Sequence, residues 1–160
     1  MSEPVHPNVA RVIEAGRRVG LDITPVRFPD GTKTAADAAA AIGVGVGQIV
    51  KSLIFAVDGD VVVAYVSGAN QLDEAKLAAA AGGSRCSRVD ADTVRQATGY
   101  PIGGVPPFGH DLPVLFDESL LEHERVWAAA GDPHSLFEVD PRQLARCVEA
   151  RVVAVGDENA

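Results

Sequence analysis

The stretch from Ile49 to Gly68 reads IVKSLIFAVDGDVVVAYVSG and contains two β-rich runs. Two runs of β-branched and aromatic residues flank the tripeptide DGD at 58–60, which is the signature of a β-hairpin. Alternate residues of the first run share one face of the strand. Neither face is polar, so we expect this strand to be covered on both sides. Lys51 lies within it and either snorkels from the strand end or projects into a cavity.

Three alternating glycines, Gly43, Gly45 and Gly47, precede Lys51 and raise the question of a phosphate-binding loop. A P-loop needs glycine directly before the lysine, whereas Val50 stands there. A Rossmann fingerprint needs the glycines to follow a strand, whereas these follow a predicted helix. We therefore expect the glycines to form a helix stop and a turn into the strand.

Helical and strand patterns continue along the chain without repeats or a low-complexity linker. Periodicity and stop signals predict helices within residues 6–21, 32–43, 72–83, 90–99 and 140–150, with Thr34, Asp73, Asp90 and Asp140 as N-caps. Further strands are predicted within 23–29, 114–116, 125–131, 135–140 and 151–155, the first of them at a sheet edge. Because βαβ alternation is absent, we predict an α+β fold with a mixed, mostly antiparallel sheet in one compact domain over residues 1–160.

The 160 residues carry a net charge of −8, which argues against broad binding of nucleic acid such as DNA but allows recognition of one RNA end. The sequence has no apolar run that could cross a bilayer and no signal-peptide pattern, so we expect a cytoplasmic protein without a membrane partner. Cys86 and Cys147 are expected to be free thiols. No ligand cluster indicates a metal site, and no cofactor is expected.

A second unusual stretch, GYPIGGVPPFGH, runs from Gly99 to His110 and carries almost no charge. Its prolines restrict the backbone, and its glycines let backbone N–H groups approach a ligand closely. Paired N–H groups can hold an oxyanion or a carbonyl oxygen. The alternative is a tight connector between a helix and a strand.

Four segments taken together resemble one known family: TAADAAAAIGVGVGQIVKSLIF, VVVAYVSGANQLDEAKLA, TGYPIGGVPPFG and AAAGDPHSLFEVDPRQLARC. Their order and spacing are similar to those of the YbaK family, also called the prolyl-tRNA synthetase-associated editing domain. The resemblance implies a compact α+β fold around a mixed, partly barrel-like sheet. It also implies a free-standing hydrolase that removes the amino acid from mischarged tRNA, here a small amino acid such as alanine or cysteine on tRNA-Pro. An aminoacyl-tRNA synthetase is a possible partner.

The resemblance also implies site residues. The family lysine matches Lys51, and the family's G-x-x-x-P loop matches Gly103, Gly104, Val105, Pro106 and Pro107. The turn from Gly131 to His134 matches a glycine-rich turn that carries a functional histidine in some members. His110 is the other candidate, and neither histidine is assigned as a general base.

We accordingly expect catalytic roles for Lys51, Gly103, Gly104 and Pro107, and substrate binding by Ser67, Asn70, Val105, Pro106, Gly131 and His134. Ser67 and Asn70 could instead form a turn before the next helix. A Ser–Lys dyad of Ser52 with Lys51 is not expected, because adjacent strand residues point to opposite faces. Two other function classes stay open: a non-catalytic module that binds an aminoacyl or nucleotide end, and a regulatory protein-binding domain.

Overall fold

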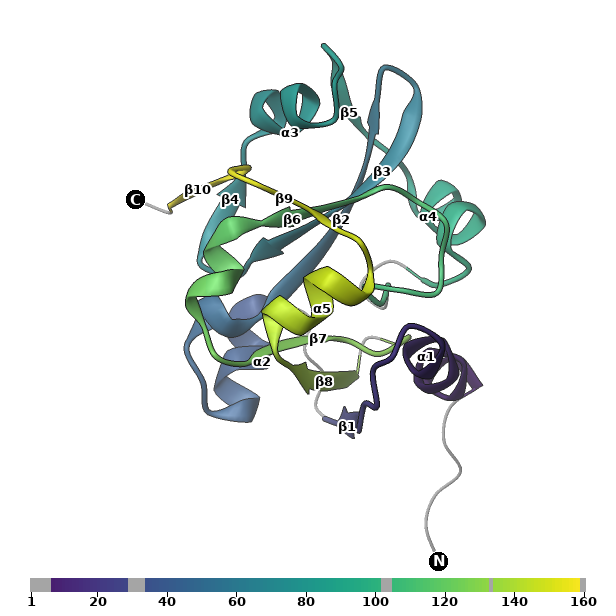
Figure 1. The fold of residues 1–160 in the computed structure, drawn as a ribbon, viewed down its shortest axis with the longest axis vertical. Coiled ribbons are helices and arrows are strands. Elements are labelled where there is room, and N and C mark those ends of the chain that lie inside the picture. The colour runs from purple at the N-terminus through teal and green to yellow at the C-terminus, as the bar shows by residue number, and fades with distance from the viewer. Residues whose placement is uncertain (1–6, 29–33, 102–104, 133, 159–160) are drawn as a thin grey trace, which may run out of the picture.

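The computed structural model describes residues 7–28, 34–101, 105–132 and 134–158, and Figure 1 shows their arrangement. The predicted hairpin is confirmed, because β2 (Val50–Val57) and β3 (Asp60–Ser67) pair antiparallel along their whole length. Asp58 and Gly59 between them have φ values of 52° and 90°. Positive φ at both turn residues matches the right-handed twist of the two strands.

This hairpin is the centre of a five-stranded sheet of order β5-β2-β3-β6-β9. The edge strand β5 (Cys86–Arg88) is antiparallel to β2, whereas β6 (Val114–Asp117) and β9 (Arg151–Val153) extend the sheet in parallel. Two antiparallel sheets accompany it, one of β1 (Val26–Arg27), β8 (Ser135–Val139) and β7 (Val126–Ala129), the other of β10 (Gly156–Glu158) and β4 (Asn70–Leu72). Parallel pairs are thus the minority, which confirms the predicted mixed, mostly antiparallel arrangement.

The helices lie where the sequence predicts them: α1 (Pro7–Arg18), α2 (Ala35–Ile42), α3 (Glu74–Ala80), α4 (Ala91–Thr98) and α5 (Pro141–Cys147). The four predicted N-caps are confirmed, since each of these side chains accepts a hydrogen bond from a backbone N–H of the first turn. Gly43 ends α2 in the left-handed conformation, with φ of 89°. A short 3-10 helix, η1 (Val46–Gln48), then leads into β2.

The central sheet is covered on both faces, as the apolar alternation of β2 predicts. One face carries Val63, Tyr65 and Phe116, which belong to a large core cluster together with residues of α1, α5 and β7. The other face carries Phe55 and Ala64 in a smaller cluster that includes Leu77 and Ala78 of α3. In Figure 1, α3 and β5 lie at one end of the molecule, and α1 lies with the β1-β8-β7 sheet at the other.

The sheets share a core without closing into a barrel. An isolated parallel bridge between Ile49 and Trp127 links the start of β2 to β7. The sequence analysis missed β4, β5, β10 and the 3-10 helices η1 and η2 (Glu118–Glu122). These elements are three to five residues long, too short to show a periodic pattern. Within the described residues, no helix is long and apolar enough to span a membrane.

Candidate functional site

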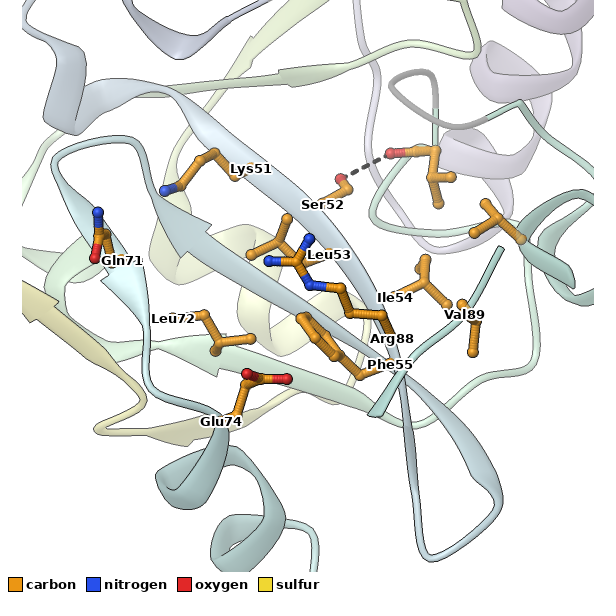
Figure 2. A pocket seen from close by; sticks show the side chains of 12 residues that line it. Lys51, Ser52, Leu53, Ile54, Phe55, Gln71, Leu72, Glu74, Arg88 and Val89 are labelled. Atoms are coloured by element: carbon orange, nitrogen blue, oxygen red, sulfur yellow. Dashed lines mark hydrogen bonds between the residues drawn. The ribbon is translucent and has the colours of Figure 1, made fainter. Parts of the chain in front are cut away.

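A pocket of about 540 Å³ opens along one edge of β2 (Figure 2). The antiparallel partner β5 pairs only with residues 55–57 of β2, so the preceding residues of that strand face the pocket instead. The wall consists of Lys51, Ser52, Leu53, Ile54, Phe55, Gln71, Leu72, Glu74, Arg88, Val89, Val94 and Val105. Its size lies within the range of sites for small ligands.

Lys51 is half-buried in this wall, and its ammonium donates a hydrogen bond to the backbone carbonyl of Asn70. Burial lowers the pKa of Lys51 from its ordinary value, and the negative charge of Asp117 opposes that shift. Of the two predictions for Lys51, the cavity is therefore the one that the structure supports. In Figure 2 its side chain points toward the segment that carries Gln71.

The carboxylate of Asp117 organises the backbone that receives Lys51. It is 1% exposed and accepts hydrogen bonds from the Ser67 N–H at 3.1 Å, the Asn70 side-chain amide at 3.0 Å and the Ser119 N–H at 2.9 Å. A buried charge held by several donors is fixed in place, and so are the donors. The sequence analysis missed Asp117, although an acidic residue at the end of the apolar strand VLFD is a signal that could have found it.

Ser67 and Asn70, predicted to bind substrate, belong to this network instead of the pocket wall. The Ser67 hydroxyl donates to the Gly47 carbonyl at 2.8 Å, and Asn70 also donates to the Ser119 hydroxyl at 3.0 Å. Both residues are at least 95% buried. Their observed contacts therefore fix the turn between β3 and β4, and substrate binding by their side chains stays a prediction.

The described part of the glycine–proline loop packs against the face of the hairpin opposite Lys51. Val105, Pro106 and Pro107 are buried, and Val105 reaches the pocket wall. The Ser52 hydroxyl donates to the Val105 carbonyl at 2.9 Å (dashed in Figure 2), which agrees with the expectation that Ser52 forms no dyad with Lys51. The pocket and the glycine–proline loop are therefore in contact at the edge of β2, through Val105 and Ser52.

Two of the predicted catalytic residues, Gly103 and Gly104, lie outside the described residues. The third loop residue, Pro107, is buried but does not line the pocket. Roles for these three residues stay predictions.

Gly131 and His134 lie in the turn between β7 and β8, and neither lines the pocket. Gly131 has φ of 102°, and a Cβ there would lie 2.8 Å from the Asn8 carbonyl oxygen, so the backbone itself requires glycine. The His134 carbonyl accepts a hydrogen bond from Phe28 N–H, while its Nδ1 is buried without a partner in the described part of the chain. Substrate binding by Gly131 and His134 therefore stays a prediction.

Arg88 and Glu74 are the charged pocket residues that the sequence analysis missed. Arg88 faces Phe55 across the β2–β5 pair, and in Figure 2 its guanidinium reaches over the pocket between Lys51 and Glu74. Both charged residues are exposed, so a ligand could reach them from solvent. The β2–β5 pairing brings Arg88 into the pocket wall that also contains Lys51, and the sequence carries no short-range signal of this pairing. Among the described residues, no group of three or more His, Cys, Asp and Glu side chains could hold a metal ion.

Comparison with known proteins identifies the family. The family model for the aminoacyl-tRNA editing domain matches residues 29–147. The chain belongs to the aminoacyl-tRNA editing domain family. That match spans the Lys51 strand, the glycine–proline loop and the turn with His134, so the resemblance inferred from the four sequence segments is confirmed.

Two relatives show in which kinds of protein similar sequences occur. The uncharacterised protein YwhH of Bacillus subtilis (strain 168) is 34% identical over 126 residues, which cover 78% of this chain and 79% of that protein. The proline–tRNA ligase of Maridesulfovibrio salexigens is 33% identical over 107 residues, or 65% of this chain but only 18% of the ligase. The chain thus corresponds to a small part of such a ligase.

Among solved structures, one described as a "putative trans-editing enzyme for prolyl tRNA synthetase" superposes with a TM-score of 0.90 at 39% identity. The superposition covers 96% of this chain and 99% of that one. The structural similarity therefore extends over nearly the whole of both chains.

Proposed function

We propose that this chain is a deacylase that hydrolyses the aminoacyl ester of mischarged tRNA. The single observation that carries the proposal is the Lys51 ammonium, held by the Asn70 carbonyl at a pocket that an editing-domain fold shapes. We also propose that residues 1–160 form one editing domain and act where charged tRNA is found, in the cytoplasm.

The 3′ end of the tRNA enters the pocket along the edge of β2. The ammonium of Lys51 binds the terminal phosphate or another oxygen of the last nucleotide, and exposed Arg88 adds a second positive charge at the same wall. Together they supply a local positive site on a chain of net charge −8. The pocket can therefore attract one RNA end without broad affinity for nucleic acid.

The reaction is an ester hydrolysis. A water oxygen bonds to the ester carbonyl carbon, the bond from that carbon to the ribose oxygen breaks, and a proton passes from the water to the ribose oxygen. Free amino acid and uncharged tRNA leave. Backbone N–H groups of the glycine–proline loop would stabilise the charge that develops on the carbonyl oxygen, and the adjacent ribose hydroxyl would orient the water.

For the finer specificity we propose a small amino acid, such as alanine or cysteine, on tRNA-Pro. The support is the match to proline–tRNA ligases and to the solved trans-editing protein. A synthetase that charges this tRNA would be the natural partner.

The test is deacylation of alanyl-, cysteinyl- and prolyl-tRNA-Pro by the wild-type chain and by Lys51→Met, which keeps the apolar stem but removes the charge. We expect hydrolysis of the mischarged species and a loss of about a hundredfold or more in the variant, as for removal of one electrostatic contact in a transition state. Lys76→Met, the same change on the exposed face of α3, is the control and should retain activity.

Two results would contradict the proposal. Wild-type turnover by a folded Lys51→Met protein would remove the lysine from the mechanism. Tight binding of charged tRNA without any hydrolysis would instead favour the non-catalytic binding module.

A further inference from the structure

Two hydroxyl groups of the hairpin hold two consecutive carbonyls of the glycine–proline loop. Ser52 on β2 and Tyr65 on β3 are direct partners in the antiparallel register, so their side chains leave the same face of the sheet. The Ser52 hydroxyl donates to the Val105 carbonyl at 2.9 Å, and the Tyr65 hydroxyl donates to the Pro106 carbonyl at 2.7 Å. One cross-strand pair therefore anchors two adjacent peptide units.

The loop needs this anchor because of its own composition. Pro106 and Pro107 have no backbone N–H, so these two residues cannot dock on the sheet by donating ladder hydrogen bonds. Their carbonyl oxygens are the only backbone groups through which they can be held by hydrogen bonds. Because both peptide units are buried, unpaired carbonyls there would be costly, and the two hydroxyls remove that cost.

His110 completes the arrangement. Its Nε2 lies 3.0 Å from the Tyr65 hydroxyl, and its Nδ1 lies 3.3 Å from the Leu112 nitrogen. The single proton of the tyrosine hydroxyl is used on Pro106, so Nε2–H must donate to Tyr65, and Nδ1 accepts from the Leu112 N–H. Only the neutral imidazole with its proton on Nε2 satisfies both contacts, so neither nitrogen is free to act as a general base.

The electrostatic surroundings support this neutral form. Burial lowers the pKa of His110, and the carboxylate of Asp111 beside it and the Pro106 carbonyl oppose that shift. Tyr65 is fully buried, and burial raises its pKa well above the ordinary value, so its hydroxyl stays a donor. No substrate can touch a group with no exposed surface.

We propose that Ser52, Tyr65 and His110 are positioning residues, which hold the Val105 and Pro106 carbonyls so that the loop keeps its place beside the Lys51 pocket. This role rests on the proposed deacylase function. Tyr65 and His110 act through Pro106, and Ser52 acts through Val105. None of the three supplies a proton to the reaction or accepts one from it.

The decisive variant is Tyr65→Phe, which removes one buried oxygen and keeps the ring in the core. We expect kcat for alanyl-tRNA-Pro to fall by about ten- to a hundredfold, as for a small misplacement of a catalytic element, while the Kd for uncharged tRNA changes by less than about twofold. Ser52→Ala should act in the same direction, and Ser52→Thr, which keeps a hydroxyl on a β-branched side chain, should restore most of kcat.

Val126→Ala is the matched control. Val126 is fully buried on β7 in the same core cluster as Tyr65, so its truncation loosens the core but leaves the Ser52 and Tyr65 hydroxyls in place. Amide hydrogen exchange supplies a readout that needs no substrate. Residues 105–112 should exchange faster in Tyr65→Phe than in Val126→Ala at equal overall stability.

The outcomes separate the two proposals. A wild-type chain that hydrolyses no mischarged tRNA would overturn the deacylase function itself. An active wild type whose Tyr65→Phe variant keeps full kcat, or whose loop exchange is no faster than in Val126→Ala, would overturn the positioning role alone. Loss of kcat together with faster loop exchange, both absent in the control, would support it.

Discussion

Replacing Asp117 by asparagine tests whether one buried carboxylate holds the backbone that receives Lys51. The substitution preserves size and shape and changes one oxygen into an NH₂ group. In the wild type, Oδ2 accepts from Ser67 N–H and the Asn70 amide, while Oδ1 accepts from Ser119 N–H. An asparagine can keep its oxygen at the Oδ2 position, but it then places its own NH₂ opposite the Ser119 N–H.

The cost follows from this geometry. One hydrogen bond to a charged group is lost, worth about 1.5–3 kcal/mol, and two donors that face each other add a desolvation cost of about 1–3 kcal/mol. Because the turn can relax in part, we expect the free energy of unfolding to fall by about 3 kcal/mol, a large share of the 5–15 kcal/mol of a typical domain. The pKa of Lys51 should fall further, since the charge of Asp117 raises it.

Urea unfolding at neutral pH measures the loss of stability, and the pH dependence of alanyl-tRNA-Pro deacylation by the folded fraction reports the fall in the pKa of Lys51. Asp140→Asn is the control: Asp140 caps α5 by accepting from Arg142 N–H at 2.9 Å, and asparagine caps a helix about as well. We expect a change within about 0.5 kcal/mol there. An Asp117→Asn protein as stable as this control would show that the Asp117 carboxylate does not hold this network together.

Two further predictions use the same protein. His110→Gln should remove a pH dependence of the free energy of unfolding. Because the pKa of His110 is lowered in the folded protein, the unfolded chain binds more protons below about pH 6.5. The contribution of His110 to wild-type stability is therefore present above that pH and is lost as the pH falls through the folded pKa. Urea unfolding of both proteins from pH 5 to 8 checks this, and parallel curves would contradict it. Arg88→Gln should weaken tRNA binding and reduce the slope of log K against log salt by about 0.7, one single-strand phosphate contact. Arg85→Gln, an exposed arginine outside the pocket wall, should keep the wild-type slope.

Local chemistry in the sequence was sufficient for most of the fold. Helix ends could be predicted because capping is a contact within one turn, as between Thr34 and Asp37 N–H at 3.0 Å. The hairpin could be predicted because Asp58 and Gly59 tolerate positive φ and because β2 and β3 are adjacent in the chain. Lys51 was conspicuous as a charge in an apolar strand, and the resemblance to the editing domain made it the first site residue.

Contacts between residues far apart in the chain could not be predicted from the sequence and became visible only in the tertiary structure. Asp117 meets Ser67 and Asn70 only because β6 pairs in parallel with β3, and a parallel pair leaves no turn signal between its strands. Arg88 joins the pocket through three residues of β5 that show no apolar pattern. The sequence therefore predicted where the chemistry takes place, at Lys51 and in the glycine–proline loop. Only the packed sheet decided which buried groups hold them in place, because a buried polar group finds its partner through space.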